Sequence, residues 1–525
     1  MRYFLSNRFC QLVLAVGIGT LLNGCGSQNA ETRIVDPPTV TGGQLLLTGV
    51  TVVDTHDGHL SPNMSVLLGG GKIISLTPTG PTPPAGAGAA KVIDARGKFV
   101  VPGYLEMHAH PLISRDVPGS LALFLANGIT GFRQMNGTPE LLEKRRNGTL
   151  RLGPDAPELL AMPGEVLNPL NAGSPEAVVQ EVRKQKAEGA DFIKVVTVSV
   201  PTFFTAQAEA KRLGLPFVGH LPEGVPVQQA SRGGMKSIEH LGPNDGLLVA
   251  CSTEEGRLEQ EIARLPPVKG PPVKIPFADK LLADKLERII INPLVPTPPA
   301  DFARLQRAID TYSDAKDRQL AAQLVADGTW QVPTLIRLRT MELGDAPEYV
   351  NDPNQRYIPA VTAKKWHEVG QDFTQKLTPA FKATYRNLYA LQLRLAKLFE
   401  ETHVPMLAGS DFGGGWLVPG FSLHQEFDEL QKAGLAPLTV LQMTTLNGAK
   451  FLNRTADTGS VEPGKNANLV LLDANPLADV QNLHRICAVV RAGRYYAHAD
   501  LENLKQQVAT RQAAGRRQAT FLLPK

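Results

Sequence analysis

The chain has 525 residues, 43% of them hydrophobic and 20% charged, and its 54 basic and 50 acidic residues give a formal net charge of +4. This composition is close to that of average soluble proteins and excludes collagen-like, wholly disordered and multi-span membrane proteins. The small net charge and the lack of long Lys/Arg runs argue against nucleic acid as a partner.

The first residues predict an export signal rather than a folded element. Arg2 and Arg8 precede a mostly apolar run at 9–22, which is the pattern of a signal peptide. The run is shorter than the roughly 20 residues that a membrane-spanning helix needs. We therefore expect residues 1–24 to be removed on export.

The end of this segment, Leu-Asn-Gly-Cys at 22–25, resembles the lipobox of bacterial lipoproteins. The resemblance implies that Cys25 is lipidated and anchors the chain to the lipid bilayer of the bacterial cell envelope. Gly26 follows the cysteine where an Asp would favour the inner membrane, which implies the outer membrane, facing the periplasm. Ordinary secretion is the alternative. Residues 25–42, rich in Pro, Thr and Gly, predict a flexible tether.

Short β-type runs follow the tether and return near the end of the chain. They lie at 45–53, 65–68, 72–76 and 91–94, with a glycine turn at 69–71, and again at 467–472 and 486–491. We expect residues 43–97 and 455–497 to form one small β-sandwich domain built from N- and C-terminal segments. Residues 498–525 predict a polar, helix-prone tail.

From about residue 98 the pattern changes to short apolar strands that alternate with helices. Eight candidate strands lie at 99–104, 129–133, 158–162, 192–196, 216–219, 236–238, 331–335 and 405–408. Helices are predicted at 175–188, 204–213, 380–402 and 437–450. This rhythm favours an α/β fold with a parallel (β/α)8 TIM barrel over 98–454. The segments 241–330 and 336–404 are too long for single helices and predict insertions at the catalytic mouth.

The candidate metal ligands come at the ends of these strands. His108 and His110 are two residues apart, so on a strand both imidazoles point to the same side and can reach one ion. Four further candidates lie at other strand ends: Lys194, His220, His240 and Asp411. Taken singly, each has an ordinary structural explanation, such as a surface Lys or an Asx turn. Six of them at one rim favour a metal site.

Four further residues have open roles. Arg337 and Arg339 follow the seventh predicted strand, where either could bind a substrate carboxylate, although a solvated loop arginine is as good an explanation. Cys251 and Cys487 remain after the signal and lipid cysteines are set aside. Two cysteines in so long a chain make no disulfide framework, so we expect separate thiols.

At this point the sequence resembles the amidohydrolase superfamily. The segment 101–110, Val-Pro-Gly-Tyr-Leu-Glu-Met-His-Ala-His, is similar to the PGxxDxHxH signature of that superfamily. The segments 189–194, 237–240 and 409–411 are similar to its strand-four, strand-six and strand-eight motifs in the imidazolonepropionase-like and Xaa-Pro dipeptidase (prolidase)-like branch. The segment 463–470 resembles the return into the β-sandwich. Glu106 and Asn468 stand where the family usually has Asp. The segment 241–330 resembles no motif of the family, so it does not indicate the substrate.

The resemblance implies a binuclear metallohydrolase. Lys194 would carry a carbamate, made with carbon dioxide, that bridges two divalent ions. One ion would also be held by His108, His110 and Asp411, and the other by His220 and His240. A hydroxide bridging the ions would attack the carbonyl of an amide or peptide-like bond, and Asp411 would pass the proton to the leaving amine. Zinc suits these ligands best, while Mn, Fe and Ni stay open.

Two other functions are weighed against this one. His220-Leu221-Pro222-Glu223 matches the HxxE of mononuclear barrel deaminases, in which Glu223 would be the proton shuttle. The other is a catalytically inactive, membrane-anchored binding protein on the same fold. The leading expectation is an enzyme acting on a small molecule such as a dipeptide, an Xaa-Pro-like peptide or a small cyclic amide. The substrate and the oligomeric state stay open.

Overall fold

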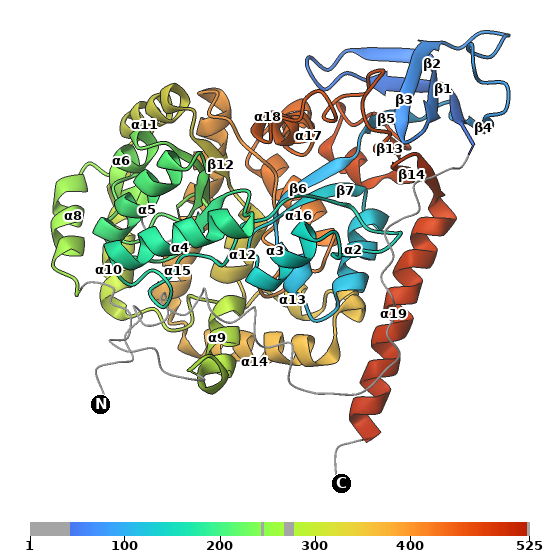
Figure 1. Cartoon of the computed structure of the whole chain (residues 1–525). Helices are drawn as coiled ribbons and strands as arrows, with labels where there is room; N and C mark the ends of the chain where they lie inside the picture. The colour runs from blue at the N-terminus through green and yellow to red at the C-terminus, as the bar shows by residue number, and fades with distance from the viewer. Residues whose placement is uncertain (1–42, 243–245, 267–277, 522–525) are drawn as a thin grey trace.

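A computed structural model of the chain describes residues 43–242, 246–266 and 278–521. The predicted signal peptide, the lipidation site at Cys25 and the tether lie outside the described residues. The described residues form a mixed α/β structure in which an outer sheet sits on a larger body of parallel strands and helices (Figure 1). The helices of the described part include none that is long and apolar enough to span a membrane.

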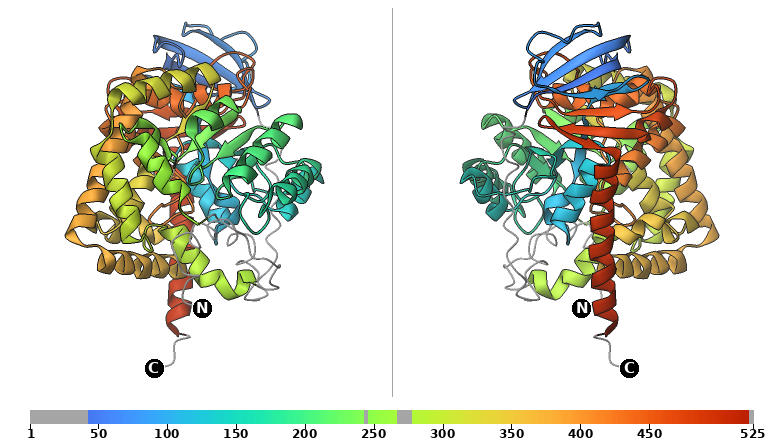
Figure 2. Two further views of the ribbon diagram at one scale, coloured as in Figure 1. Left: turned by 90° about the vertical axis from the view of Figure 1, so that its left-hand side faces the viewer. Right: turned by 90° about the vertical axis from the view of Figure 1, so that its right-hand side faces the viewer.

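The outer sheet takes strands from both ends of the chain. Its order is β15-β14-β13-β5-β1-β2-β3, with β4 paired to β1. The strands are β1 (Leu45–Val53), β2 (Leu60–Gly69), β3 (Lys72–Pro78), β4 (Lys91–Asp94), β5 (Phe99–Pro102), β13 (Leu469–Leu472), β14 (Ile486–Arg491) and β15 (Arg494–Ala497). β13 runs antiparallel beside β5, which places the last strands of the chain directly under the first ones (Figure 2). All eight belong to one sheet, and the two-sheet sandwich stays a prediction.

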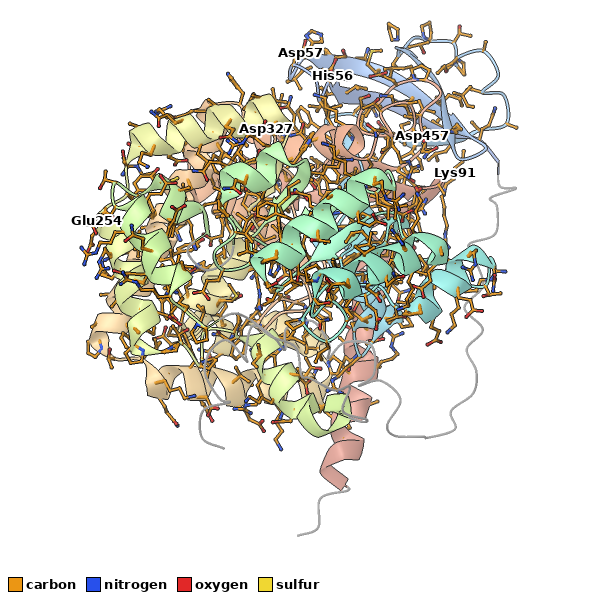
Figure 3. The ribbon with its side chains drawn as sticks, turned by 60° about the vertical axis from the view of Figure 1, so that its left-hand side comes forward. His56, Asp57, Lys91, Glu254, Asp327 and Asp457 are labelled. Carbon is orange, nitrogen blue, oxygen red and sulfur yellow. The ribbon has the colours of Figure 1, made fainter. Side chains whose placement is uncertain are left out.

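One face of this sheet carries its own aliphatic core. Side chains alternate between the two faces of a strand, and those on the inner face are buried together: Leu45, Leu47, Val66, Val100, Leu469, Leu471 and Val490. The loop after β1, with His56 and Asp57, lies at the edge of the sheet (Figure 3). There Gln442 Nε2 donates to Thr55 O at 2.9 Å and joins the sheet to the larger body.

The larger body contains two parallel sheets. One consists of β6 (Tyr104–Ala109), β7 (Ile129–Gln134) and β8 (Glu158–Ala161), and the other of β9 (Ile193–Val195), β10 (Phe217–Gly219), β11 (Met235–Glu239) and β12 (Trp330–Val332). The predicted eighth strand, 405–408, makes only an isolated bridge between Met406 and Gln331. It still lies between the sheets, since Met107 N donates to Ala408 O at 3.0 Å and Leu407 N donates to Gln331 O at 2.9 Å. The described strands thus form two arcs of a TIM-barrel-like arrangement rather than one closed ladder.

Two sequence predictions in this body are wrong in detail. The predicted strand 99–104 divides at Gly103, so that β5 joins the outer sheet and β6 starts the barrel. A Cβ at Gly103 would lie 2.1 Å from Thr130 Oγ1, so this close approach requires glycine. The predicted helix 437–450 is broken between α17 (Pro437–Met443) and α18 (Leu446–Phe451). The break frees the carbonyls of Met443 and Thr444, which accept the backbone N–H groups of Ala408 and Leu105.

The remaining helices surround these strands. They are α2 (Val117–Ala126), α3 (Pro139–Arg146), α4 (Pro175–Glu188), α5 (Val200–Arg212), α6 (Val227–Arg232), α7 (Gly246–Cys251), α8 (Glu255–Ala263), α9 (Ala278–Ile291), α10 (Pro299–Asp310), α11 (Asp314–Asp327), α12 (Leu335–Glu342), α13 (Pro347–Val350), α14 (Ala360–Lys376), α15 (Pro379–Glu401), α16 (Phe421–Lys432) and α19 (His498–Phe521). Short 3-10 turns are η1 (Pro111–Ile113), η2 (Pro353–Tyr357) and η3 (Val480–His484).

The described residues of the two segments predicted as insertions are mostly helical. The segment 241–330 contains α7 to α11, and 336–404 lies almost wholly in α12 to α15. The C-terminal α19 runs along the outside of the molecule beside α2 (Figure 2), where Gln512 Nε2 donates to Asp116 Oδ2 at 2.7 Å. Cys251 and Cys487 are both free thiols, the first buried and the second half-buried.

Candidate metal centre

The six predicted ligand residues are brought together at one end of the parallel strands. His108 is in β6, and Lys194 is the middle residue of β9. His220 and His240 directly follow β10 and β11. A cavity of about 190 Å³ opens here, and its walls include His110, Lys194, His220, His240 and Asp411. His108 lies fully buried beneath it.

Asp411 is at the centre of the cluster. Its Oδ1 lies 3.2 Å from His108 Nε2 and 3.1 Å from His110 Nε2, and its Oδ2 lies 4.0 Å from His240 Nε2. Lys194 Nζ lies 3.0 Å from His108 Nε2. The ring centroid of His220 is 4.9 Å from that of His240. The ligand atoms of His108, His240 and Asp411 all lie within 4.8 Å of one another, close enough for one ion.

Hydrogen bonds behind the cluster decide which imidazole nitrogen carries the proton. Glu239 Oε2 lies 2.7 Å from His108 Nδ1, and Arg133 and Ser237 both donate to the same carboxylate. Burial opposes its ionisation, but the Arg133 guanidinium and His108 hold the pKa of Glu239 well below its usual range. An ionised Glu239 accepts a hydrogen bond from the N–H at Nδ1, so the lone pair of His108 is on Nε2.

His240 is oriented in the same way. Thr334 Oγ1 donates to Pro333 O at 2.8 Å and therefore accepts from His240 Nδ1 at 2.6 Å. The lone pair of His240 is then on Nε2, the nitrogen that faces Asp411. Two imidazole lone pairs thus face the Asp411 carboxylate, with Lys194 Nζ beside His108 Nε2, and all of these atoms are ligand types for a cation.

The backbone at these strand ends is strained. His240, Thr334 and Asp411 have φ values of 58°, 47° and 55°, in the left-handed region that costs a non-glycine residue about 1–2 kcal/mol. These residues lie just after β11, β12 and the neighbouring segment 405–408, respectively. Such strain persists where the surroundings impose it, and it clusters at functional sites.

Burial disfavours the charged forms of His110, His220 and Lys194. It lowers the pKa of His110 to about 4 and that of His220 to about 3, and it lowers the pKa of Lys194 to about 8. Burial opposes ionisation of Asp411, but His240 and His108 hold its pKa well below the usual range where they carry a proton. Neutral imidazoles beside an ionised carboxylate are the donor set that a divalent cation requires, and they fit zinc or a similar ion.

The predicted arginines have different surroundings. Arg337 is buried, its Nε lies 3.2 Å from Asp411 Oδ2, and its Nη atoms donate to the carbonyls of Ile290 and Ile291. It therefore holds Asp411 and lines the cavity. Arg339 pairs with Glu348 and Glu429 instead and is not among the residues that line the cavity.

Sequence reasoning missed the residues behind the ligands. The sequence analysis gives no role to Glu239, Thr334 or Arg133. Glu239 could have been noticed, because a charged residue in the short apolar strand 235–239 indicates a buried carboxylate with a specific partner. Glu106, noted only as a departure from the family pattern, accepts from Ser410 Oγ and from the backbone N–H groups of His108 and Ser410. It joins β6 to the Asp411 loop.

Comparisons with known proteins agree with this geometry. An amidohydrolase family model matches residues 396–495. An imidazolonepropionase of Shouchella clausii (strain KSM-K16) is 40% identical over 63 residues, which are 11% of this chain and 14% of that protein. The sequence match therefore spans a small part of the curated relative.

Solved structures extend the similarity to nearly the whole chain. A bottromycin amidohydrolase has a TM-score of 0.63 at 22% identity, covering 89% of this chain and 90% of that one. A Xaa-Pro dipeptidase with bound methionine has a TM-score of 0.54 at 17% identity, covering 87% and 100%. These likenesses show an amidohydrolase-type, TIM-barrel-like α/β fold. The family-model match and the imidazolonepropionase match bear out the predicted resemblance to amidohydrolases over the parts of the chain that they cover, and the solved structures, a Xaa-Pro dipeptidase among them, show a likeness of fold.

Proposed function

We propose that this protein is a metal-dependent hydrolase that cleaves the C–N bond of a dipeptide, an Xaa-Pro-like peptide or a small cyclic amide. The observation that carries the proposal is the cluster itself: the Nε2 atoms of His108 and His240 face the Asp411 carboxylate, and the buried Lys194 Nζ lies 3.0 Å from His108 Nε2. Imidazole nitrogens and a carboxylate are ligand types that a divalent cation takes, and amide hydrolysis is the chemistry of the proteins that the fold resembles.

The residues divide into two sets of ligands. His108, His110 and Asp411 would hold one divalent ion, His220 and His240 a second, and Lys194 would bridge them as its carbamate. Such ions would supply an activated water and polarise the scissile carbonyl. The low pKa of Lys194 supports the carbamate, because only a neutral amine reacts with carbon dioxide.

The chain itself handles the proton. Asp411 lies at the centre of the site and is ionised, so it can accept a proton from the attacking water and deliver it to the leaving amine. Arg337 holds one carboxylate oxygen of Asp411, which leaves Oδ1 facing His108 and His110. Glu239 and Thr334 keep His108 and His240 in the tautomer that ligates.

The deaminase alternative depends on Glu223, and its surroundings oppose that role. Glu223 Oε1 lies 3.0 Å from Arg304 Nη2, and Glu223 is absent from the residues that line the cavity, although Leu221 and Pro222 are among them. A proton shuttle has to reach the leaving nitrogen. A buried partner on α10 holds this carboxylate away from it.

The test is a metal count joined to a pair of variants. We expect about two zinc ions per chain by mass spectrometry and activity on a dipeptide and amide library. Asp411→Asn should lose on the order of 10²–10⁴-fold in kcat, the usual worth of a general acid–base, and Glu223→Gln should stay within about tenfold of the parent. One metal per chain together with an inactive Glu223→Gln would favour the deaminase, and no metal and no turnover would favour the binding protein.

The carbamate has its own test. Lys194→Ala should abolish turnover and lower the metal content, and short carboxylic acids should restore part of both by replacing the bridge. Near-normal kcat in Lys194→Ala would contradict the binuclear arrangement.

We also propose that the protein is an exported lipoprotein anchored through Cys25, in the outer membrane of a bacterial envelope. The support is the sequence pattern at 1–25. The full chain should fractionate with membranes, and the chain made from residue 26 onward should be soluble. A Cys25→Ser protein that stays membrane-bound after cleavage of the signal would refute the lipid anchor.

A further inference from the structure

The cavity over the metal centre continues into an apolar chamber between α12 and α15. Its walls there are formed by Leu338 and Met341 of α12 and by Tyr385, Leu388 and Leu395 of α15. Leu338 and Met341 are three residues apart, so both project from one face of α12. The chamber can therefore hold an apolar group of a ligand whose reacting bond lies at the metal centre.

A buried polar pair interrupts this apolar wall. Glu342 of α12 and Gln392 of α15 are 3% and 7% exposed, and both line the cavity. Gln392 Nε2 donates to Glu342 Oε1 at 2.7 Å. Among the described residues, Glu342 Oε2 and Gln392 Oε1 have no hydrogen-bond partner.

The two unpaired oxygens of Glu342 and Gln392 lower the stability of the folded protein. A buried polar atom left without a partner costs about 1–3 kcal/mol, and two Leu side chains at these positions would pack α12 against α15 without that cost. Burial raises the pKa of Glu342 well above its usual range, and the Gln392 amide offsets this only in part. No cationic side chain of the described residues is paired with Glu342. Its free oxygen and that of Gln392 therefore fit a partner that comes from outside the chain.

The position of the pair relates it to the reacting bond. Arg337, next to Asp411, and Glu342 are five residues apart on α12, and a rise of 1.5 Å per residue separates them by about 7.5 Å along the helix. Arg337, Leu338, Met341 and Glu342 all line the cavity. A ligand that extends from the metal centre along this face passes apolar side chains first and the polar pair last.

We propose that Glu342 and Gln392 are specificity-determining residues that bind an N–H-bearing group, an amine or a carboxamide, at the far end of an otherwise apolar substrate side group. This inference deepens the proposed function and rests on it for the place of the reacting bond. Amines and carboxamides share the required chemistry, since each offers an N–H donor to the two oxygens and can be paired by both side chains at once. An amine would donate to ionised Glu342, whereas a carboxamide would bind the neutral form, accepting from the protonated Glu342 Oε2 with its carbonyl and donating an N–H to Gln392 Oε1.

The test compares dipeptides that contain norleucine, glutamine or lysine, in either position, against the same second residue. In the parent enzyme with zinc bound, kcat/KM for a glutamine or lysine peptide should exceed that of the norleucine peptide by about tenfold or more. Glu342→Leu should lower the polar rates about 10–100-fold and leave the norleucine rate unchanged or higher, because a site built to bind N–H is penalised when one partner is missing.

Two further variants distinguish an amine ligand from a carboxamide ligand, and loss of the polar pair from a general change of the cavity wall. Glu342→Gln should keep the glutamine preference and lose the lysine preference, which would identify a carboxamide and an amine as distinct ligands. Met341→Leu alters the same wall without touching the polar pair, so the ratio of glutamine to norleucine rates should not change. An equal fall of all rates in Glu342→Leu, or no preference for N–H-bearing side groups in the parent, would overturn the inference.

A binding measurement distinguishes failure of this inference from failure of the proposed function. Calorimetry of L-glutamine, L-lysine and L-norleucine with parent and Glu342→Leu protein needs no turnover. If no peptide is hydrolysed but the polar amino acids bind the parent at least tenfold more tightly than they bind Glu342→Leu, the proposed function fails and the polar pair stands. If peptides are hydrolysed without that preference, the polar pair fails and the proposed function stands.

Discussion

The outer sheet and the strand-end cluster use their buried residues in opposite ways. The sheet buries aliphatic side chains such as Leu47, Val100 and Leu471 against one another. The cluster buries Lys194, Glu239 and Arg133 and holds His240 and Asp411 in strained backbone conformations. The sheet gains stability from burial, whereas the cluster loses stability by burying charged and polar groups. Substitutions in the cluster should therefore lower activity and raise the stability of the metal-free protein, whereas substitutions in the sheet should lower stability and leave activity unchanged.

The largest effect should come from Lys194→Met, which keeps the length of the side chain and removes its charge. If Lys194 carries the proposed bridge between two ions, activity should fall at least about 10³-fold. Stability of the metal-free protein at pH 7 should rise by up to about 3 kcal/mol, since burial lowers the pKa of Lys194 from 10.5 to about 8 and the folded protein bears that penalty.

Urea unfolding of the chelated proteins measures this gain. The penalty is complete below about pH 8 and vanishes above about pH 10.5, so the gain should shrink over that range. A Lys194→Met protein that is less stable than the parent at pH 7 would contradict the comparison.

Leu47→Ala should show the opposite pattern. Leu47 is fully buried in the sheet core, and removing its isobutyl group should lower the free energy of unfolding by about 2–5 kcal/mol. The kcat measured well below the unfolding temperature should stay that of the parent, because the sheet contributes no residue to the cavity walls. A matched fall in kcat and stability would show that the two regions are not separable.

Glu106→Gln should reveal the burial cost behind the ligands. Burial raises the pKa of Glu106 to about 7, so the folded metal-free protein loses stability as the pH rises from about 4.5 through 7. The Gln variant lacks this loss, and its stability relative to the parent should improve by about 3 kcal/mol between pH 4.5 and pH 8. Chemical unfolding of both proteins at the two pH values measures the difference; a gap that does not change with pH would refute the assignment.

The smallest effect should be at Asp94 in β4. Arg96 holds the pKa of Asp94 at about 2 through a hydrogen-bonded ion pair, but both side chains are exposed. Exposed pairs contribute little because water and salt screen them. Asp94→Asn should leave the unfolding temperature and kcat unchanged within error, and a clear drop in the unfolding temperature would show that the surface of the sheet is also sensitive to charge.

The clustering of the candidate ligands could be predicted because these residues are local features of the sequence. His108, Lys194, His220 and His240 each lie in or directly after a short apolar strand, and strand ends of a parallel barrel meet at one rim. The residues behind them could not be predicted in the same way. Thr334 contacts His240 across 94 positions, and Glu342 contacts Gln392 across 50, and no periodicity connects such pairs.

In the fold, too, elements marked by local sequence patterns could be predicted, and features that depend on distant contacts could not. Strands 45–53, 91–94 and 486–491 and helix 175–188 match their predicted bounds, because strong periodicity and turn residues mark them. The split at Gly103 and the break at Thr444 depend on which distant backbone groups need partners. The segment 405–408 has the pattern of a strand, but its ladder is interrupted at the loop that carries Asp411.

The shared sheet also sets the order in which the molecule can be completed. β5 lies between β1 and β13, so its outer edge has no strand beside it until residues 469–472 have been synthesised and have docked. Pairings this distant in sequence form slowly, and an open β edge can pair with other chains in the meantime. A chain that stops before β13 would hold every candidate ligand and still present this edge, so premature termination should produce aggregates rather than a truncated enzyme.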